Sequence, residues 1–230
     1  MRTRAALDIL RDPTYTVPPV PAAVEPASVA WLRASVARFS DGAVHERRRA
    51  HVVEELAAID PARLRAAAFD RAGRALAGGV PLATVARRVP VELLVESLGG
   101  PADAVPDVLA VGRVYLPATT PADAEADRAV ERLVAVFGAG ERGAARIGLL
   151  AQACEATAGL ILRAVDRGLW EALRSDPPVR GTRRVDPLDG AEVFVDFGTD
   201  GRLAFGAGAH ECPGREHAMA LAAGVVQAAR

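Results

Sequence analysis

The stretch Phe205-Gly-Ala-Gly-Ala-His-Glu-Cys-Pro-Gly214 is the most informative part of the chain. Its glycines at 206, 208 and 214 have no Cβ, so they allow positive φ angles or a close approach of the backbone to another group. Cys212 stands just before Pro213, a residue type favoured in the first turn of a helix. At that place a thiolate would face the positive end of the helix dipole and free N–H groups, which lower a thiol pKa. Such surroundings suit a thiolate that ligates iron.

Four other interpretations of this stretch stay open when it is taken by itself. Glycines before a helix can cradle a phosphate, although the G-x-G-x-x-G spacing of dinucleotide-binding proteins is missing. His210, Cys212 and His217 offer three zinc ligands, but a fourth ligand and a C-x-x-C pair are lacking. A protease-type cysteine would come here without a local signature. The last alternative is a helix-capping loop without chemistry.

The segments around this loop predict a mainly α fold with a small β component. After the loop, residues 215–228 form the last expected helix, and before it, residues 179–185 and 192–197 have strand-like patterns. Residues 143–167 are apolar nearly all round, which predicts a central buried helix. Asp60-Pro61 predicts a helix start, and Gly78-Gly79 and Gly99-Gly100 predict helix ends. Further helices are expected over 31–39, 43–59, 81–98, 120–137 and 169–174.

The domain organisation predicted from these patterns is simple. Residues 1–28 are rich in proline and alanine and include Val17-Pro-Pro-Val-Pro21, which predicts an extended N-terminal arm. Residues 29–230 form a single expected domain.

Composition excludes several classes of function. The 230 residues are 50% hydrophobic and carry 28 basic against 29 acidic side chains, a balance typical of a globular protein without a nucleic-acid partner. Two cysteines cannot make a disulfide framework. No segment reads as a signal-peptide core, and no run approaches the roughly 20 apolar residues of a membrane span. We therefore expect a cytoplasmic protein with no membrane partner.

The pattern F-x-x-G-x-H-x-C-x-G, formed by Phe205, Gly208, His210, Cys212 and Gly214, resembles the haem-ligand signature of the cytochrome P450 superfamily. The resemblance implies an abbreviated cytochrome P450-like fold that binds haem b, with Cys212 as the proximal iron ligand. The loop residues, Gly206 included, would then contact the cofactor, and the helix 215–228 would run beneath the porphyrin.

Other segments resemble the same family in the same chain order. Glu171-Ala-Leu-Arg174, followed by a Pro-Pro turn, resembles its E-x-x-R helix, whose acid and base form a buried structural pair. His45 and Arg49 resemble its H-x-x-x-R pattern and, being four residues apart, share one helix face. The resemblance implies that His45, Arg49, Arg184 and His210 hold the haem propionates, which accept bidentate hydrogen bonds from arginine.

The chain departs from the family in two respects. The central helix resembles the family's A-G-x-[D/E]-T pattern at Glu155, but Ala156 replaces the threonine, and Thr157 lies about 100° further around the helix. Proton delivery would then use ordered water or a substrate hydroxyl. The chain is also unusually short, with little room between Ile161 and Glu171 or between Val185 and Phe205. We expect an open-topped fold closed by a homodimer or a partner protein, with Arg202 as the third member of the Glu171–Arg174 cluster.

Two classes of function follow from the resemblance. The first is a haem–thiolate oxidoreductase, monooxygenase- or peroxygenase-like, acting on a small organic intermediate of bacterial-type specialised metabolism. Ferredoxin and ferredoxin reductase would supply electrons, unless peroxide is the oxidant. The alternative is a non-catalytic auxiliary protein that stabilises a partner enzyme. Retention of Cys212 favours the first, because a scaffold needs no iron ligand; a haem-based sensor or carrier is not separated from the enzyme by sequence.

Overall fold

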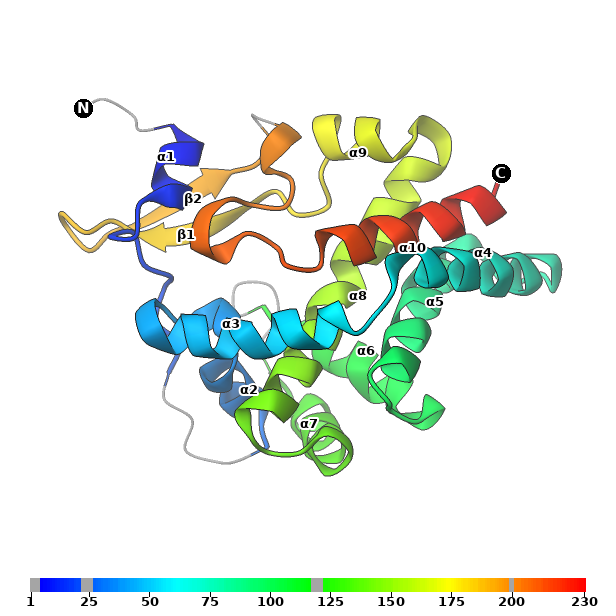
Figure 1. Cartoon of the computed structure of the whole chain (residues 1–230), viewed down its shortest axis with the longest axis horizontal. Coiled ribbons are helices and arrows are strands. Elements are labelled where there is room, and N and C mark those ends of the chain that lie inside the picture. The colour runs from blue at the N-terminus through cyan, green and yellow to red at the C-terminus, as the bar shows by residue number, and fades with distance from the viewer. Residues whose placement is uncertain (1–4, 22–26, 117–121, 199–200) are drawn as a thin grey trace.

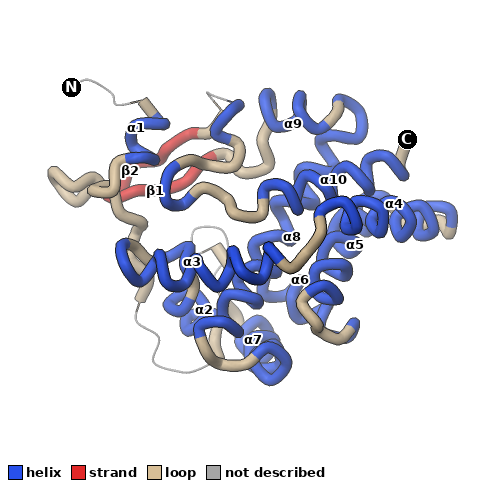
Figure 2. Tube along the Cα trace, in the orientation of Figure 1, coloured by secondary structure: helices blue, strands red, loops and turns tan. Residues whose placement is uncertain are grey.

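The computed structural model describes residues 5–21, 27–116, 122–198 and 201–230. Within these ranges the helices are α1 (Ala6–Arg11), α2 (Val29–Ser35), α3 (Gly42–Ala57), α4 (Pro61–Ala77), α5 (Leu82–Ser97), α6 (Val105–Val114), α7 (Ala124–Phe137), α8 (Glu141–Arg167), α9 (Leu169–Ser175) and α10 (Arg215–Ala228). The strands are β1 (Gly181–Val185) and β2 (Glu192–Asp196). Short 3₁₀ turns lie at Ala37–Phe39, Ala102–Ala104, Gly201–Leu203 and Gly208–His210. The predicted fold class, mainly α with a small β component, is confirmed (Figure 2).

Helices α4, α5, α8 and α10 pack together around the main core. Helix α10 lies closely against α4, where a Cβ at Gly224 would come within 2.3 Å of the Arg65 carbonyl oxygen, so only glycine fits. Helix α8 is long and apolar enough to cross a membrane, but most of it is buried against neighbouring helices. Burial on several sides explains why its sequence is apolar nearly all round.

The two strands form an antiparallel hairpin at the other end of the molecule (Figure 1). In its register Arg184 faces Val193, and Thr16 of the N-terminal segment joins the edge through a bridge to Val185. A second, smaller core beneath the hairpin combines N-terminal residues with residues of β2 and the following loop: Ile9, Leu10, Tyr15, Val195, Phe197, Leu203 and Ala207.

Most predicted helices form where expected, and the differences have local causes. Asp60 caps α4 by accepting a hydrogen bond from the Ala62 N–H at 2.8 Å. Helix α7 begins at Ala124 behind an Asp123 cap, whereas the predicted start at Thr120-Pro121 lies outside the described residues. Helix α6 was not predicted, because its valine-rich sequence has low helix propensity and is held by packing against α7 and α8.

The N-terminal arm differs from its prediction as well. The described part of residues 1–28 contains helix α1, and α1 contacts both β2 and the turn Gly208–His210. Ile9 and Leu10 are buried there, so the N-terminal segment contributes to packing instead of extending into solvent.

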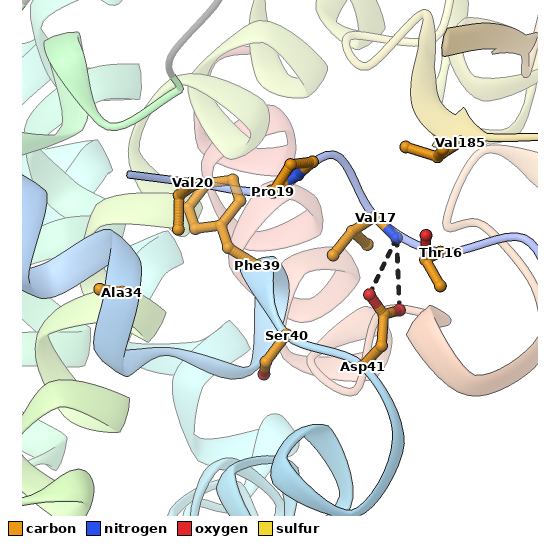
Figure 3. Close-up of a pocket in the computed structure, with 9 residues that line it drawn as sticks. All are labelled: Thr16, Val17, Pro19, Val20, Ala34, Phe39, Ser40, Asp41 and Val185. Carbon is orange, nitrogen blue, oxygen red and sulfur yellow. Dashed lines mark hydrogen bonds between the residues drawn. The ribbon is translucent and has the colours of Figure 1, made fainter. Parts of the chain in front are cut away.

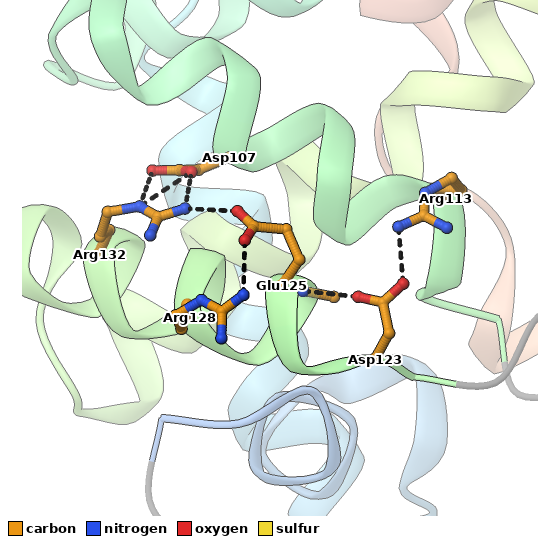
Figure 4. A network of polar contacts seen from close by, with 7 residues as sticks. Asp107, Arg113, Asp123, Glu125, Arg128 and Arg132 are labelled. Carbon is orange, nitrogen blue, oxygen red and sulfur yellow. Dashed lines mark hydrogen bonds and ion pairs between the residues drawn. The ribbon is translucent and has the colours of Figure 1, made fainter.

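Ion pairs join the surfaces of the helices. Arg132 of α7 donates to Asp107 of α6 and to Glu125 (Figure 4). Arg113, near the end of α6, donates to Asp123 at 2.8 Å. The Arg113–Asp123 and Arg132–Glu125 pairs are exposed, so each contributes little to stability by itself.

Glu55 makes a more buried connection between α3 and α8. Its carboxylate is 7% exposed and accepts from Arg142 Nε at 2.5 Å, with Arg146 Nε at 3.0 Å. Burial by itself would raise the pKa of Glu55, but the hydrogen bonds from Arg146 and Arg142 outweigh it, so the pKa is lowered.

We predict that Glu55→Gln lowers the free energy of unfolding at neutral pH by about 1–3 kcal/mol, because two arginines lose their charged acceptor. A carboxyl whose pKa is lowered in the folded state stabilises the fold above its unfolded pKa. The free energy of unfolding of the wild type should therefore fall as the pH drops below about 4.5. The variant, which lacks this carboxyl, should not show this fall. Urea denaturation of wild type and variant, at neutral pH and at a pH below about 4.5, measures both the loss of stability and its pH dependence. Glu54→Gln, at a side chain that is 59% exposed, is the matched control. Equal losses in the two variants would contradict the prediction.

Candidate functional site

The loop between β2 and α10 holds Cys212 in a defined backbone conformation. Cys212 N–H donates to the Phe205 carbonyl at 2.9 Å, and Gly206 N–H donates to Leu203 at 2.7 Å. Gly206 and Gly208 have φ angles of +74° and +71°, which favour glycine, whereas Gly214 has a φ of −93° and needs no special freedom. Two of the three glycines therefore have the backbone role that the sequence predicts.

Gly208 is also where the loop touches the N-terminal segment. A Cβ at this position would lie 2.2 Å from the carbonyl oxygen of Leu10. Because real Cβ atoms do not come so close, glycine is required for α1 to dock against the loop.

Cys212 differs from its prediction in one property. The residue is exposed, yet enough protein surrounds its sulfur for burial to raise the thiol pKa. The nearby Gly214 N–H and Arg49 act to lower the pKa without offsetting that rise. The sequence predicted a lowered pKa from a helix start at Pro213, but α10 begins only at Arg215, so its dipole acts from further away.

Two histidines and an aspartate meet beside this loop. His45 of α3 is buried, and its ring lies 4.1 Å from that of His210, measured between centroids. His210 Nε2 is 3.3 Å from the Asp41 carboxylate, which also accepts the Val17 N–H at 3.1 Å (Figure 3). Burial, His45 and Arg184 lower the pKa of His210 to about 4, so both the burial and the neighbouring charges keep its ring neutral at pH 7.

Arg184 of β1 is a buried cation at the same place. It is 4% exposed, and its guanidinium donates to Thr182 Oγ1 at 3.1 Å and to the Arg183 carbonyl at 2.9 Å. Among the described residues no carboxylate pairs with it within ion-pair distance, although the charge of Asp41 acts on it. Burial lowers the pKa of Arg184, and Arg38 adds a repulsive positive charge. A buried arginine of this kind is suited to an anionic ligand.

Arg49 completes a cluster that we call cationic after its three arginines: Arg38, Arg49 and Arg184, with the rings of His45 and His210 beside them. It lies one helical turn from His45, and its charge acts on both His45 and Cys212. Within the described ranges Arg49 has no ion pair. The structure therefore gathers the four predicted propionate contacts and Cys212 in one place, and these residues fit a cofactor with two carboxylates and an iron that takes a thiolate.

The zinc interpretation does not fit this arrangement. His217 Nε2 bonds to the carbonyls of Leu56 and Ile59, each at 3.0 Å, so it turns toward the α3–α4 connection. In the described part of the chain no three His, Cys, Asp or Glu side chains gather to hold a metal ion.

A cavity of about 600 Å³ adjoins the cluster (Figure 3). The N-terminal segment forms one wall with Thr16 and Val17, and Phe39 and Asp41 form another. Asp41 thus connects this cavity with His210.

The residues expected on the oxygen face of α8 lie in different surroundings. Glu155 is exposed and lines a second cavity between α5 and α6, Ala156 is half-buried, and Thr157 is buried. Thr157 therefore does not share the surroundings of Glu155.

The Glu171–Arg174 pair forms, but at the surface. Arg174 donates to Glu171 at 2.6 Å, and their side chains are 71% and 43% exposed. The resemblance implied a buried pair. In this chain α9 follows α8 after Gly168 alone and lies at the edge of the molecule, where it packs against α8, α10 and the turn that contains Arg202 (Figure 1).

Comparisons with known proteins identify the fold. No family model matches the chain, and no curated protein matches it. Among solved structures, P450BioI in complex with an acyl carrier protein carrying hexadec-9Z-enoic acid has a TM-score of 0.74 at 16% identity, over 96% of this chain and 81% of that one. Substrate-free CYP109E1 from Bacillus megaterium has a TM-score of 0.70 at 16% identity, covering 97% and 81%. LnmZ, a cytochrome P450 hydroxylase of the leinamycin biosynthetic pathway of Streptomyces atroolivaceus, has a TM-score of 0.64 at 19% identity, covering 97% and 86%.

The chain has a cytochrome P450-like fold. This confirms the family resemblance that the sequence motif indicated, as far as the fold is concerned. The structure also shows two residues of this site that the sequence analysis missed: one member of the cationic cluster, Arg38, and the carboxylate beside it, Asp41. Arg38 lies in a 3₁₀ turn with no motif around it, and Asp41, although it precedes His45 in the quoted segment, acts through contacts with residues far away in sequence.

We predict that Gly208→Ala destabilises the P450-like fold far more than Gly190→Ala. Both positions have positive φ, so either alanine costs about 1–2 kcal/mol of backbone strain. Only at Gly208 does the new Cβ meet the Leu10 carbonyl, which should add about 1–3 kcal/mol. Denaturant unfolding of both variants measures the difference, and equal losses would show that α1 does not dock against the loop.

Proposed function

We propose that this protein binds haem b through Cys212 and acts as a haem–thiolate oxidoreductase on a small organic molecule. The observation that carries the proposal is the position of the thiol beside the cationic cluster. This cluster includes Arg184, which is buried and has no carboxylate within ion-pair distance among the described residues. The Gly214 N–H, which acts to lower the pKa of the thiol, supports a ligand role, because N–H groups near a sulfur tune a thiolate ligand.

Each residue of the site would have a distinct task. Cys212 would supply the iron ligand and lose its proton on binding, as coordinating thiols do. Arg184, Arg49, His45 and His210 would hold the two propionates. Haem held by a thiolate supplies chemistry that activates dioxygen or peroxide.

Proton supply would depend on water. Glu155 would hold the proton on α8, and because Ala156 has no hydroxyl, water would have to carry it onward. Monooxygenation with ferredoxin and ferredoxin reductase, or a peroxygenase reaction with peroxide, are the two proposed routes. We propose a cytoplasmic location and a biosynthetic substrate, in line with neighbours such as the leinamycin hydroxylase.

A non-catalytic auxiliary role is the second candidate. The exposure of the Glu171–Arg174 pair and the missing hydroxyl at Ala156 favour it, because α9 would offer a partner enzyme an uncovered face. The complex of P450BioI with an acyl carrier protein supports protein partners for P450-like folds in general.

Haem titration of the purified chain tests the ligand. We expect the wild type and Cys154→Ala to bind one haem with the Soret band of a thiolate complex, and Cys212→Ala to lose that band. Cys154 is the matched control because it is buried in α8 against the Leu150 carbonyl. Failure of the wild type to bind haem would contradict the enzyme proposal and favour the auxiliary role. A pull-down with a partner enzyme would then test that role.

The cationic cluster has its own test. We predict that Arg184→Gln weakens haem binding by about tenfold to a hundredfold, because a charge-assisted hydrogen bond to a propionate is lost. Arg183→Gln, at the exposed neighbouring residue that pairs with Glu192, should leave haem affinity unchanged. Competition with a haem-binding apoprotein measures both, and an equal effect of the two substitutions would contradict the propionate role.

A further inference from the structure

The outer edge of β2 is an open edge of the two-stranded sheet. In the register of the hairpin Arg183 faces Phe194, and the hydrogen bonds between the strands involve the alternate positions, as where Phe197 N–H donates to the Arg180 carbonyl at 2.8 Å. Because bonded and non-bonded positions alternate along an antiparallel pair, the N–H and C=O groups of Glu192 and Phe194 point away from β1. No described residue bonds to either backbone group of Phe194.

The opposite edge of the hairpin already accepts an added strand. Val185 N–H donates to the Thr16 carbonyl at 2.9 Å, in an antiparallel bridge between the N-terminal segment and β1. Since a hairpin of two strands is only marginally stable by itself, each added strand stabilises it. The outer edge of β2 offers the same kind of pairing to a second strand.

An exposed aromatic ring lies on this edge. Phe194 is 56% exposed, and its ring lies across β1, where a Cβ at Gly181 would come within 2.6 Å of the ring carbon Cζ. Glycine at this position therefore leaves room for the ring. A ring that is already held in place provides apolar contact at a low cost in conformational entropy. An open strand edge with an apolar side chain is a ready surface for another extended chain.

The charges of the hairpin define the chemistry of that chain. The hairpin and its flanking residue have two exposed arginines against four carboxylates, namely Arg180, Arg183, Asp186, Asp189, Glu192 and Asp196. Side chains alternate along a strand, so Glu192 and Asp196 lie on the same face as Phe194, one on each side of it. A strand with an apolar residue between two basic ones, each two positions away, therefore complements this edge.

A second copy of β2 complements the edge less well. Two-fold pairing about Phe194 would place Glu192 of each copy opposite Asp196 of the other. Two-fold pairing about Val193 would bring two Glu192 carboxylates together on the diagonal, and pairing about Val195 would do the same for Asp196. Like charges that face each other across strands are destabilising, so the edge favours a basic partner over itself.

We propose that the outer edge of β2 binds an extended basic segment of a partner protein, which adds to the sheet as an antiparallel strand. Phe194 exchanges N–H and C=O hydrogen bonds with an apolar residue of that segment, and the flanking basic residues lie opposite Glu192 and Asp196. The antiparallel direction is the one that the Thr16 bridge already has. None of these side chains belongs to the proposed haem site, so the inference does not rest on haem binding.

Calorimetric titration of the full chain, with and without haem, tests the proposal with two heptapeptides that have blocked ends. The probe is Thr-Arg-Val-Phe-Val-Arg-Thr, and its matched control has glutamate in place of both arginines. We expect a Kd below about 1 mM for the probe and at least about tenfold weaker binding of the glutamate peptide, because two attractive pairs become repulsive. Absence of probe binding, or equal binding of the two peptides, would overturn the proposal.

Two methylated probes test the backbone pairing. In the proposed antiparallel arrangement the N–H of the central phenylalanine points to β2, and the N–H of the following valine points away from it. N-Methylation of the phenylalanine should weaken binding at least about tenfold, and N-methylation of that valine should leave the Kd unchanged. Equal effects of the two would overturn strand addition. Both peptides are titrated against the wild-type chain, so this result does not depend on the folding of a variant.

A substitution in the chain assigns the binding to this edge. Phe194→Thr, which keeps a strand-forming side chain, should weaken binding of the probe by about threefold to tenfold. Trp170→Gln, at an aromatic residue of α9 that is 67% exposed, is the control and should bind the probe as the wild type does. Equal effects of the two substitutions would overturn the assignment.

Sedimentation velocity of the chain without peptide examines the second copy as the occupant. We expect the same sedimentation coefficient for the wild type and Phe194→Thr at all concentrations. A wild-type dimer that Phe194→Thr dissociates would assign the edge to a second copy and overturn the proposal. The Soret titration reports separately on haem, so failure of one proposal is distinguishable from failure of the other.

Discussion

A buried guanidinium is costly unless an anion accompanies it. Arg184 is such a buried guanidinium, and the arrangement of the site depends on it. Its hydrogen bonds go to a threonine hydroxyl and a backbone carbonyl, and the nearby negative charge of Asp41 acts from beyond ion-pair distance. His45 and His210 avoid adding charge, because burial lowers their pKa values. The surroundings of Cys212 are thus arranged as a site for an anionic group.

Three separate parts of the chain create this arrangement. Helix α3 carries His45 and Arg49, β1 carries Arg184, and the loop before α10 carries His210 and Cys212. The N-terminal segment joins them, because Thr16 bridges to β1, Val17 donates to Asp41 and Leu10 packs on Gly208. A segment that the sequence predicts to be an extended arm therefore fixes the relative positions of the hairpin, the loop and the start of α3.

The sequence predicts the parts of this fold that depend on local patterns. Helix caps such as Asp60 and the apolar run of α8 place elements correctly because they act within a few residues. The haem-ligand motif likewise indicates the P450-like fold and the residues that gather around Cys212. Properties set by distant packing are not predicted: α6 forms despite weak propensity, Asp41 meets His210 across most of the chain, and Glu171 and Arg174 stay exposed. The thiol pKa of Cys212 belongs to this second group, because desolvation depends on everything that surrounds the sulfur.

The central claim is that Cys212 ligates iron, and X-ray absorption at the iron edge of the haem-loaded protein tests it most directly. The account predicts one sulfur scatterer at bonding distance in the wild type and its absence in Cys212→Ala. An iron environment of nitrogen and oxygen alone in the wild type would contradict the account.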